Sequence, residues 1–494
     1  MFSNIFKKHV DFFLPYLTDL INLSLVSGFF PEIYKHALVK PKLKKETLEK
    51  NVLANYRPVS NLSFLSKVIE RIVLKQFLFW LESNSLMPLF QSGYRKYHST
   101  ETALLKLISD IYASMDDQMV ALLALLDMSA AFDCVDHFVL LDKLVGKYGI
   151  SDCVANWFKS YLCGRTQQVV FNNQLSDVVT VPYGVPQGSV LGPILFILYT
   201  ADVFPIIEKF GYRVYAFADD FQIVAGCKAS AFQNLVEEFL CCLSEIEIWM
   251  SRHHLKLNKS KTQLLPLGTW QQVSRLDLRS TNFGGLDLEF CSVATNLGVV
   301  LDTNLSMRYH VNQMVRSCSF QLRKLQTIKR YLNKDVIRSL THAFVCSRLD
   351  YCNSLLFGVS DKLMAKLQSI QNCAARFIEG GTKFEHASPL VRQLHWLPVN
   401  KRIVFKIGVI VFKCLNGLAP KYLMDSCISK TCLPSLRSSN LNYLSVPSTN
   451  LVVGSRNFAV VGPDIWNNLP QDLRRPGLTL AQYRRGLKTY LFEN

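Results

Sequence analysis

The sequence predicts a protein of mixed helices and sheet, either α+β or α/β, followed by a helical region. Between residues 119 and 265 short apolar strands alternate with helices, which indicates a sheet covered on one face. Beyond about residue 305 apolar residues recur at helical spacing instead. Several of them share one face of an expected helix: Leu363, Leu367, Ile370, Ala374 and Phe377. The length of 494 residues and the apolar content of 49% suffice for two or three domains in series.

The first hundred residues are expected to be rich in helix. Residues 1–54 read as a helical lead-in. It ends in a basic cluster that a solvated face explains as well as contact with phosphates does: Lys40, Lys42, Lys44 and Lys45. Residues 65–81 have apolar side chains at helical spacing. A turn-rich stretch, 90–99, then ends in a helix-capping signal at Ser99 or Thr100.

Two more helices are expected further along the chain. Residues 232–249 carry apolar side chains at steps of three and four, which predicts one long amphipathic helix. From about residue 430 a Ser- and Leu-rich segment punctuated by prolines leads to a terminal helix. That terminal helix is basic, with Arg484, Arg485 and Lys488.

The charge balance favours a polyanionic partner. Fifty-five Lys and Arg against 38 Asp and Glu give a formal charge of +17, which suits nucleic acid, although a merely basic protein is the alternative. The 14 cysteines show no paired Cys-x-x-Cys spacing, so we expect neither a disulfide framework nor a zinc ribbon. A reducing compartment fits this pattern best.

Neither a signal peptide nor a membrane span is expected. Met1–Val10 has two lysines but no apolar core and cleavage site after them. The apolar run Val190–Ile207 is interrupted by Pro193 and Asp202 and is better explained as buried helix. We therefore expect a soluble intracellular protein without a membrane partner, in the nucleus or the cytoplasm.

Three acids stand where strands end. Asp127 closes an apolar strand just before the chain turns toward a helix. Asp219 and Asp220 lie between two short apolar strands, in YRVYAFADDFQI. Adjacent acids at a hairpin tip repel one another unless a divalent cation neutralises them. Mg²⁺ prefers such hard oxygen ligands, so the three acids are candidates to hold a pair of ions for nucleotidyl transfer.

A turn rich in glycine and proline forms the third candidate piece. In YGVPQGSVLGPILF, Gly184, Pro186 and Gly188 force a turn ahead of an apolar helix, and Gln187 projects an amide from it. Such a turn can present backbone to the sugar and base of a nucleotide.

Together these motifs resemble a known family. AAFD, VPQGSVLGP and FADD, in this order, resemble motifs A, B and C of the reverse transcriptases of LINE-type (non-LTR) retrotransposons. Further stretches extend the resemblance: NYRPVSNLSFLSKVIE, FQSGYRKYHSTETALL, LKLNKSKTQLL and NLGVVLD. SRLDYCNSLL, LHWLPVNKRI and WNNLP are similar to the C-terminal part of Jockey-related elements. Complete elements carry an endonuclease upstream, which we expect this chain to lack.

The resemblance implies an α+β right-hand polymerase with an antiparallel palm sheet. Its parts would be a lead-in, fingers, palm, helical thumb or connection, and a mostly helical C-terminal extension: 1–54, 55–118, 119–304, 305–429 and 430–494. It also implies RNA-directed DNA synthesis with two Mg²⁺ ions, for which Mn²⁺ could substitute. The expected partners are an RNA template, a DNA primer or target, and dNTPs.

Carried over residue by residue, the resemblance gives the acids their roles. Asp127 and Asp219 would bridge the ions, with Asp220 beside them as a less certain direct ligand. Phe132 matches the aromatic gate of motif A, which excludes the 2′-hydroxyl of a ribonucleotide. Plain core packing is the alternative role for this ring.

The resemblance also assigns residues around the nucleotide. Gln187 and Gly188 match the motif B turn beside the incoming nucleotide. Lys261 matches the motif D lysine suited to protonating departing pyrophosphate, with Lys259 as its local competitor.

Basic residues of the expected fingers would neutralise triphosphate or template charge. They are Arg57, Arg95 and Lys96. Tyr97 stands where a smaller residue is expected, which puts the geometry of this loop in doubt.

Two other functions compete with an active reverse transcriptase. One is a retroelement relic that binds RNA through its basic surface without synthesis. The other is an RNA-replicating viral polymerase, which Phe132 disfavours because such enzymes admit ribonucleotides.

Overall fold

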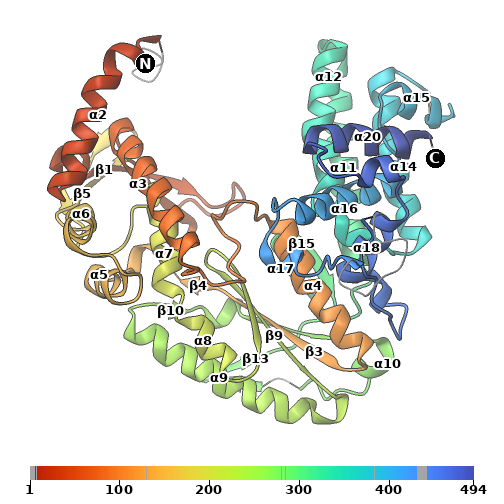
Figure 1. Cartoon of the computed structure of the whole chain (residues 1–494), viewed down its shortest axis with the longest axis horizontal. Coiled ribbons are helices and arrows are strands. Elements are labelled where there is room, and N and C mark those ends of the chain that lie inside the picture. Colours follow the sequence, from red (N-terminus) through yellow and green to blue (C-terminus); the bar gives the residue numbers. More distant parts are fainter. Residues whose placement is uncertain are drawn as a thin grey trace.

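The chain folds as an α+β protein in which two arms rise from a shared base (Figure 1). The N-terminal elements form one arm, the C-terminal helices form the other, and the central strands with their covering helices form the base. The mixed class expected from the sequence is confirmed. The computed structural model describes residues 6, 8–129, 131–279, 281–283, 285–382, 384–430 and 442–493.

The N-terminal arm is built around a small sheet. Strand β1 (His36–Leu43) pairs antiparallel with β2 (Tyr56–Asn61) and parallel with β5 (Thr166–Phe171). Short strands β6 (Gln174–Leu175) and β7 (Val179–Thr180) extend it from β5. The helices of this arm are α2 (Val10–Ser27), α3 (Phe64–Ser83), α5 (His137–Gly146) and α6 (Asp152–Leu162). Helix α3 confirms the helix expected over residues 65–81.

The expectation of a helical lead-in over residues 1–54 was wrong in part, because β1 lies within it. Ala37 and Val39 of this strand are buried, whereas Lys40 and Lys42 are exposed. Such alternation with a period of two is the pattern of a half-buried strand. The prediction gave weight to the lysines and overlooked the apolar residues Ala37 and Val39 that precede them.

The base is an antiparallel sheet in the order β11-β3-β9-β8. Its strands are β3 (Val120–Leu126), β8 (Arg213–Phe217), β9 (Asp220–Cys227) and β11 (Gln263–Leu267). The expectation of a sheet covered on one face was wrong. Ala121 and Leu123 of β3 join the core that contains helix α4 (Thr100–Asp116), and Leu122 and Ala124 join the core on the opposite face. The sequence VALLALL offers no polar face, so both sides of this strand are buried.

Helices α7 (Gly192–Thr200), α8 (Val203–Glu208) and α9 (Phe232–Arg252) belong to the second core. Helix α9 confirms the long helix expected over residues 232–249. The apolar run Val190–Ile207 forms α7, which is almost wholly buried as expected, and most of α8, in which Val203, Phe204 and Ile207 are buried. By length and composition helix α2 could cross a membrane, and only 11% of it is buried, a feature that the sequence analysis did not single out.

Short elements complete the base. Three small antiparallel pairs are β4 (Met128–Ser129) with β10 (Lys256–Leu257), β12 (Thr281–Phe283) with β13 (Leu286–Leu288), and β14 (Val293–Asn296) with β15 (Val299–Asp302). A one-turn helix, α10 (Trp270–Val273), follows β11.

The C-terminal arm is helical, as expected. Its elements are α11 (Arg308–Ile328), α12 (Lys334–Thr341), the π-helix η7 (His342–Cys346), α13 (Ser347–Asp350), η8 (Asn353–Leu356), α14 (Asp361–Glu379), α15 (Ala387–Gln393), α16 (Val399–Leu415), α17 (Lys421–Met424), α18 (Phe458–Asn467), α19 (Gln471–Arg474) and α20 (Leu480–Glu493). Helices α18 and α20 pack on α16, and α4 shares their hydrophobic core. The described part of residues 430–494 therefore packs within this arm; residues 431–441 lie outside the described part.

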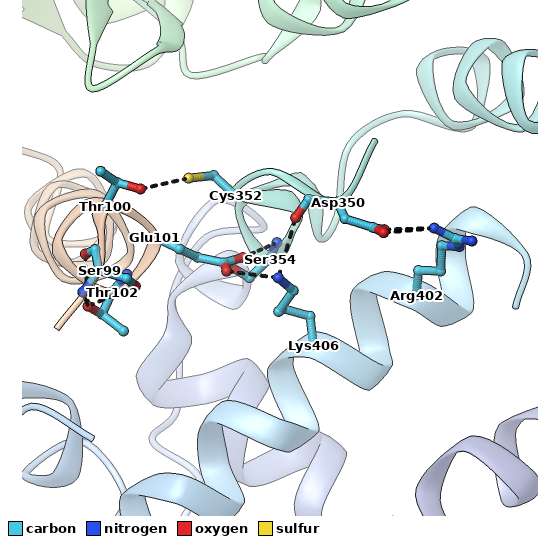
Figure 2. A network of polar contacts seen from close by, with 9 residues as sticks. All are labelled: Ser99, Thr100, Glu101, Thr102, Asp350, Cys352, Ser354, Arg402 and Lys406. Carbon is cyan, nitrogen blue, oxygen red and sulfur yellow. Dashed lines mark hydrogen bonds and ion pairs between the residues drawn. The ribbon is translucent and has the colours of Figure 1, made fainter. Parts of the chain in front are cut away.

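A polar network joins α4 to the C-terminal arm (Figure 2). The carboxylate of Glu101 accepts hydrogen bonds from the backbone and the hydroxyl of Ser354, at 3.2 and 2.8 Å. Its other oxygen pairs with the ammonium of Lys406 at 3.1 Å. Lys406 also donates to the carbonyl of Asp350, whose carboxylate holds Arg402 through two bonds of 2.8 and 2.9 Å. Three stretches that are distant in sequence are thereby tied together.

Substitution Glu101→Gln should lower the free energy of unfolding by about 1–2 kcal/mol, because Lys406 loses its charged partner in a partly buried setting. The midpoint of urea unfolding measures this loss. Glu208→Gln, at an exposed position of α8, is the matched control. Equal midpoints for the Glu101 variant and the control would show that the network does not stabilise the junction.

Candidate active site

Strand pairing brings the three acids of the sequence analysis to one end of the base sheet. Asp127 follows the last residue of β3, and Asp219 and Asp220 lie where β8 turns into β9. The antiparallel register pairs Leu126 with Phe221, so the next position along β3 lies beside Asp220. Asp127 and Asp220 accordingly line the same small cleft.

The turn between β8 and β9 is tight and strained. Phe217 pairs with Asp220, which leaves Ala218 and Asp219 at the tip. Ala218 has a φ of 61°, in the left-handed region. For a residue with a side chain this backbone conformation costs about 1–2 kcal/mol. Contacts from outside the hairpin must therefore hold the turn.

The acids repel one another. Burial raises the pKa of Asp219, and the charge of Asp127 raises it further, whereas Arg57 opposes the shift. Burial in the cleft, followed by the charges of Asp219 and Asp127, raises the pKa of Asp220 to about 6. A site that resists ionisation in this way gains from a cation placed among its carboxylates.

Two neighbouring side chains hold the carboxylate of Asp127. Lys261 pairs with it at 3.1 Å, and the amide of Asn258 donates to the same oxygen at 3.0 Å. Lys259, the alternative candidate for the same role, instead pairs with Glu247 at 2.8 Å. Among the described residues, no three acidic, histidine or cysteine side chains enclose a metal position as they stand. Here an ammonium group supplies the positive charge beside Asp127.

The turn of VPQGS docks against the N-terminal arm. The backbone N–H of Ser60 in β2 donates to the carbonyl of Gln187 at 2.8 Å. Gly188 has a φ of 128°, and a Cβ there would lie 2.5 Å from the carbonyl oxygen of Ser60, so this position requires glycine. The amide of Gln187 donates to the carboxylate of Asp133, at 3.0 and 3.1 Å. The turn thus spans from β2 to the segment that follows Asp127.

The remaining predicted residues differ in their surroundings. The ring of Phe132 stacks on Phe196 of α7, with centroids 4.7 Å apart. Arg57 is exposed on β2 and acts electrostatically on Asp219. The guanidinium of Arg95 donates to the backbone carbonyls of Pro88 and Gln91, at 2.8 and 3.1 Å, so it is at least partly engaged in holding its own loop.

The loop that contains Lys96 and Tyr97 is strained. Tyr97 has a φ of 66°, a conformation that favours small residues, and its ring lies 4.7 Å below the ammonium of Lys96. Tyr97, which replaces the smaller residue expected from the resemblance, therefore occupies a left-handed backbone position.

Sequence reasoning missed several residues that shape the site. Glu70 of α3 is fully buried, and its carboxylate accepts the backbone N–H groups of Val190 and Leu191 at 2.7 and 3.1 Å. An acid on the apolar face of a helix was the available signal. Asn296 is 3% exposed and lines the same cleft as Asp127.

Comparison with known proteins identifies the family. Residues 43–285 match the model of the family described as reverse transcriptase (RNA-dependent DNA polymerase). They include all three acids and the glycine-containing turn. This part of the chain is therefore a reverse transcriptase domain, and members of this family bind RNA templates and use divalent metal ions.

Relatives come from mobile elements. The probable RNA-directed DNA polymerase from transposon BS of Drosophila melanogaster is 28% identical over 78% of this chain and 43% of its own length. The RNA-directed DNA polymerase from mobile element jockey of Drosophila funebris is 28% identical over 67% of this chain and 36% of its own length. Residues 43–285 thus match the reverse transcriptase family, and most of the chain is similar to polymerases of mobile elements, although it spans less than half the length of these curated relatives.

Among solved structures, apo telomerase from Candida tropicalis is similar over 78% of this chain and 67% of that chain. The TM-score is 0.42 and the identity 12%, a likeness too distant to add to the assignment.

The charge repulsion at the acids predicts a pH-dependent stability. The pKa of Asp220 is raised in the folded state, so the unfolded chain loses this proton first and the folded state is destabilised as the pH rises from about 4 to about 6. In EDTA, Asp220→Asn should therefore stabilise the protein above pH 6 and leave it unchanged below pH 4. We expect a gain of roughly 1 kcal/mol, because water screens the open cleft.

Thermal melting at pH 3.5 and pH 7.5 measures this difference. Asp177→Asn, at an exposed position in the N-terminal arm, is the control. A melting temperature of the Asp220 variant that follows the wild type at both pH values would contradict the repulsion.

Proposed function

We propose that this chain is an RNA-directed DNA polymerase that adds dNTPs to a primer 3′-hydroxyl on an RNA template. The observation that carries the proposal is the β3–β9 register, which puts an acid from each of two distant motifs at one cleft. The oxygen of the hydroxyl would attack the α-phosphorus of the dNTP. The bond to the bridging oxygen then breaks, and pyrophosphate leaves.

The donor set fits a pair of divalent cations. Asp127, Asp219 and Asp220 offer hard carboxylate oxygens, and burial and mutual repulsion disfavour their ionisation while no cation is bound. We propose that Asp127 and Asp219 hold both ions, with Asp220 beside them. When bound, Mg²⁺, or Mn²⁺ in its place, supplies the charge that activates the hydroxyl and stabilises the leaving pyrophosphate.

Residues around the acids would bind and orient the nucleotide. The Nζ of Lys261, which lies 3.1 Å from the carboxylate of Asp127, would give a proton to the departing pyrophosphate. Gln187 and Gly188 would present their turn to the incoming nucleotide. Arg57 of β2, whose charge acts on Asp219, would neutralise triphosphate charge, a role that we also keep for Arg95.

We also keep the domain boundaries as proposals. The fingers would occupy residues 55–118, the palm 119–304, the thumb or connection 305–429 and the C-terminal extension 430–494. A DNA primer or target would complete the set of partners, and the net charge of +17 suits both nucleic acids. An intracellular location, nuclear or cytoplasmic, follows from these partners.

Substitution Asp219→Asn tests the activity. On a primed RNA template with Mg²⁺ and dNTPs, incorporation should fall by at least about a hundredfold, the upper end of the loss seen for groups that merely support metal ligands. Asp177→Asn serves again as the control and should incorporate like the wild type. Incorporation by the Asp219 variant equal to that of the wild type would contradict the assignment of Asp219 as a catalytic acid. An RNA-binding relic would instead bind RNA in a salt-sensitive way and incorporate nothing, even as the wild type.

Substitution Phe132→Val tests the gate. Removing the ring should lower the preference for dNTPs over rNTPs, measured as the ratio of their kcat/KM values, by about 10–200-fold. Phe132→Tyr keeps the ring and should keep the ratio. Because Phe132 also stacks on Phe196, melting temperatures should be compared as well. A lower melting temperature with an unchanged ratio would leave Phe132 with the packing role alone.

A further inference from the structure

The chemistry proposed above makes no use of Gln91, yet this residue contacts the turn between β8 and β9, which we call the catalytic turn. Gln91 lies in the stretch between α3 and α4 and is fully buried, at 0% exposure. A buried primary amide must find partners for its oxygen and both N–H groups, or its burial destabilises the fold. The partners it has found are informative.

The side chain of Gln91 forms hydrogen bonds with both the N–H and the carbonyl of Ala218. Its Oε1 accepts the N–H of Ala218 at 3.0 Å, and its Nε2 donates to the carbonyl of Ala218 at 3.2 Å. The same oxygen accepts the N–H of Gly93 at 2.9 Å. A carboxylate could not make this set of contacts, because it has no N–H to donate.

The backbone on either side of Gln91 continues the contact with strand β8. The N–H of Ala216 donates to the carbonyl of Phe90 at 3.1 Å, and the N–H of Ser92 donates to the carbonyl of Ala216 at 2.8 Å. A Cβ on Gly93 would lie 2.4 Å from the backbone nitrogen of Ala218. The residues Phe90, Gln91, Ser92 and Gly93 together form what we call the cradle of the turn.

The turn needs such support. Ala218 holds a left-handed backbone angle, and it is followed directly by two acids that repel one another. Both effects favour a relaxed turn in which the carboxylates move apart. Hydrogen bonds to the N–H and the carbonyl of Ala218 oppose that relaxation and fix the position of the backbone from which Asp219 extends.

The cradle is itself backed by the C-terminal arm. The hydroxyls of Ser92 and Tyr422 lie 2.9 Å apart, both buried. A few residues further on, Glu101 is fixed by Ser354 and Lys406 in the network of Figure 2. The segment therefore spans from the catalytic turn to the helical arm with both ends bonded.

We propose that Gln91 is a positioning residue for the catalytic acids: it holds Ala218 so that Asp219 and Asp220 share a cation with Asp127. This inference rests on the proposed function for its meaning. The geometric claim can nevertheless be measured without polymerisation, because it concerns how tightly the acids bind a divalent cation.

The test compares Gln91→Met, which keeps the length and volume of the side chain but lacks the amide, with Glu101→Gln on the same segment. Binding of Mn²⁺ to the full chain is followed by the electron paramagnetic resonance signal of the free ion. The Mn²⁺ dissociation constant and the Mg²⁺ concentration for half-maximal incorporation should rise about 10–100-fold in Gln91→Met, the loss typical for groups that orient metal ligands. Both values should stay within about twofold of wild type in Glu101→Gln, although that variant is less stable.

Values for folded Gln91→Met within twofold of wild type would overturn the proposal. So would an equal rise in both variants, which would mark a general loosening of the segment. Should Gln91→Met fail to fold, Gln91→Asn takes its place, since it keeps the amide but withdraws it from Ala218. The same rise of about 10–100-fold is expected, and values within twofold of wild type would overturn the proposal. Wild-type protein that binds Mn²⁺ tightly but incorporates no dNTP would count against the proposed function alone.

Discussion

The pairing of β3 with β9 is the contact on which the site depends. The two strands come from motifs almost a hundred residues apart, and their register alone sets which side chains meet at the end of the sheet. A slip of one residue would turn every side chain of the shifted strand to the opposite face and move Asp127 away from Asp220. The apolar residues of β3 are buried on both faces of the sheet, so the strand that leads to Asp127 lies within the core.

The same pairing creates an electrostatic problem that the surrounding residues answer. Three carboxylates lie at one end of the sheet, and burial together with their mutual repulsion raises the pKa values of Asp219 and Asp220. Lys261 and Asn258 hold Asp127 from one side, and the cradle around Gln91 holds the turn from another. A divalent cation would relieve the remaining repulsion, which is why a structure built in this way suits metal-dependent phosphoryl chemistry.

Much of this could be predicted from the sequence, because the motifs coincide with strong local patterns. The apolar strand before Asp127 and the short strands around Asp219 predicted the sheet of the base, and the periodicity of residues 232–249 predicted α9. Strand β1 was missed because its alternation is brief and is interrupted by lysines. The covering of both sheet faces was missed because it depends on α4, whose partners lie hundreds of residues away.

The contacts of single polar residues could not be predicted in the same way. Nothing local distinguishes Gln91, whose partner is a peptide group 127 residues further along the chain. Arg95 looked free to meet phosphate, but two of its contacts are carbonyls of its own loop. Such assignments depend on three-dimensional neighbours, which periodicity and motif spacing do not report.

The most direct test of the account is a crystal structure of the protein with Mn²⁺, in which anomalous scattering locates the ions. The account predicts anomalous peaks within about 2–2.5 Å of carboxylate oxygens from both Asp127 and Asp219, with Lys261 displaced from Asp127. Peaks at other sites, with Asp127 still paired to Lys261, would contradict it.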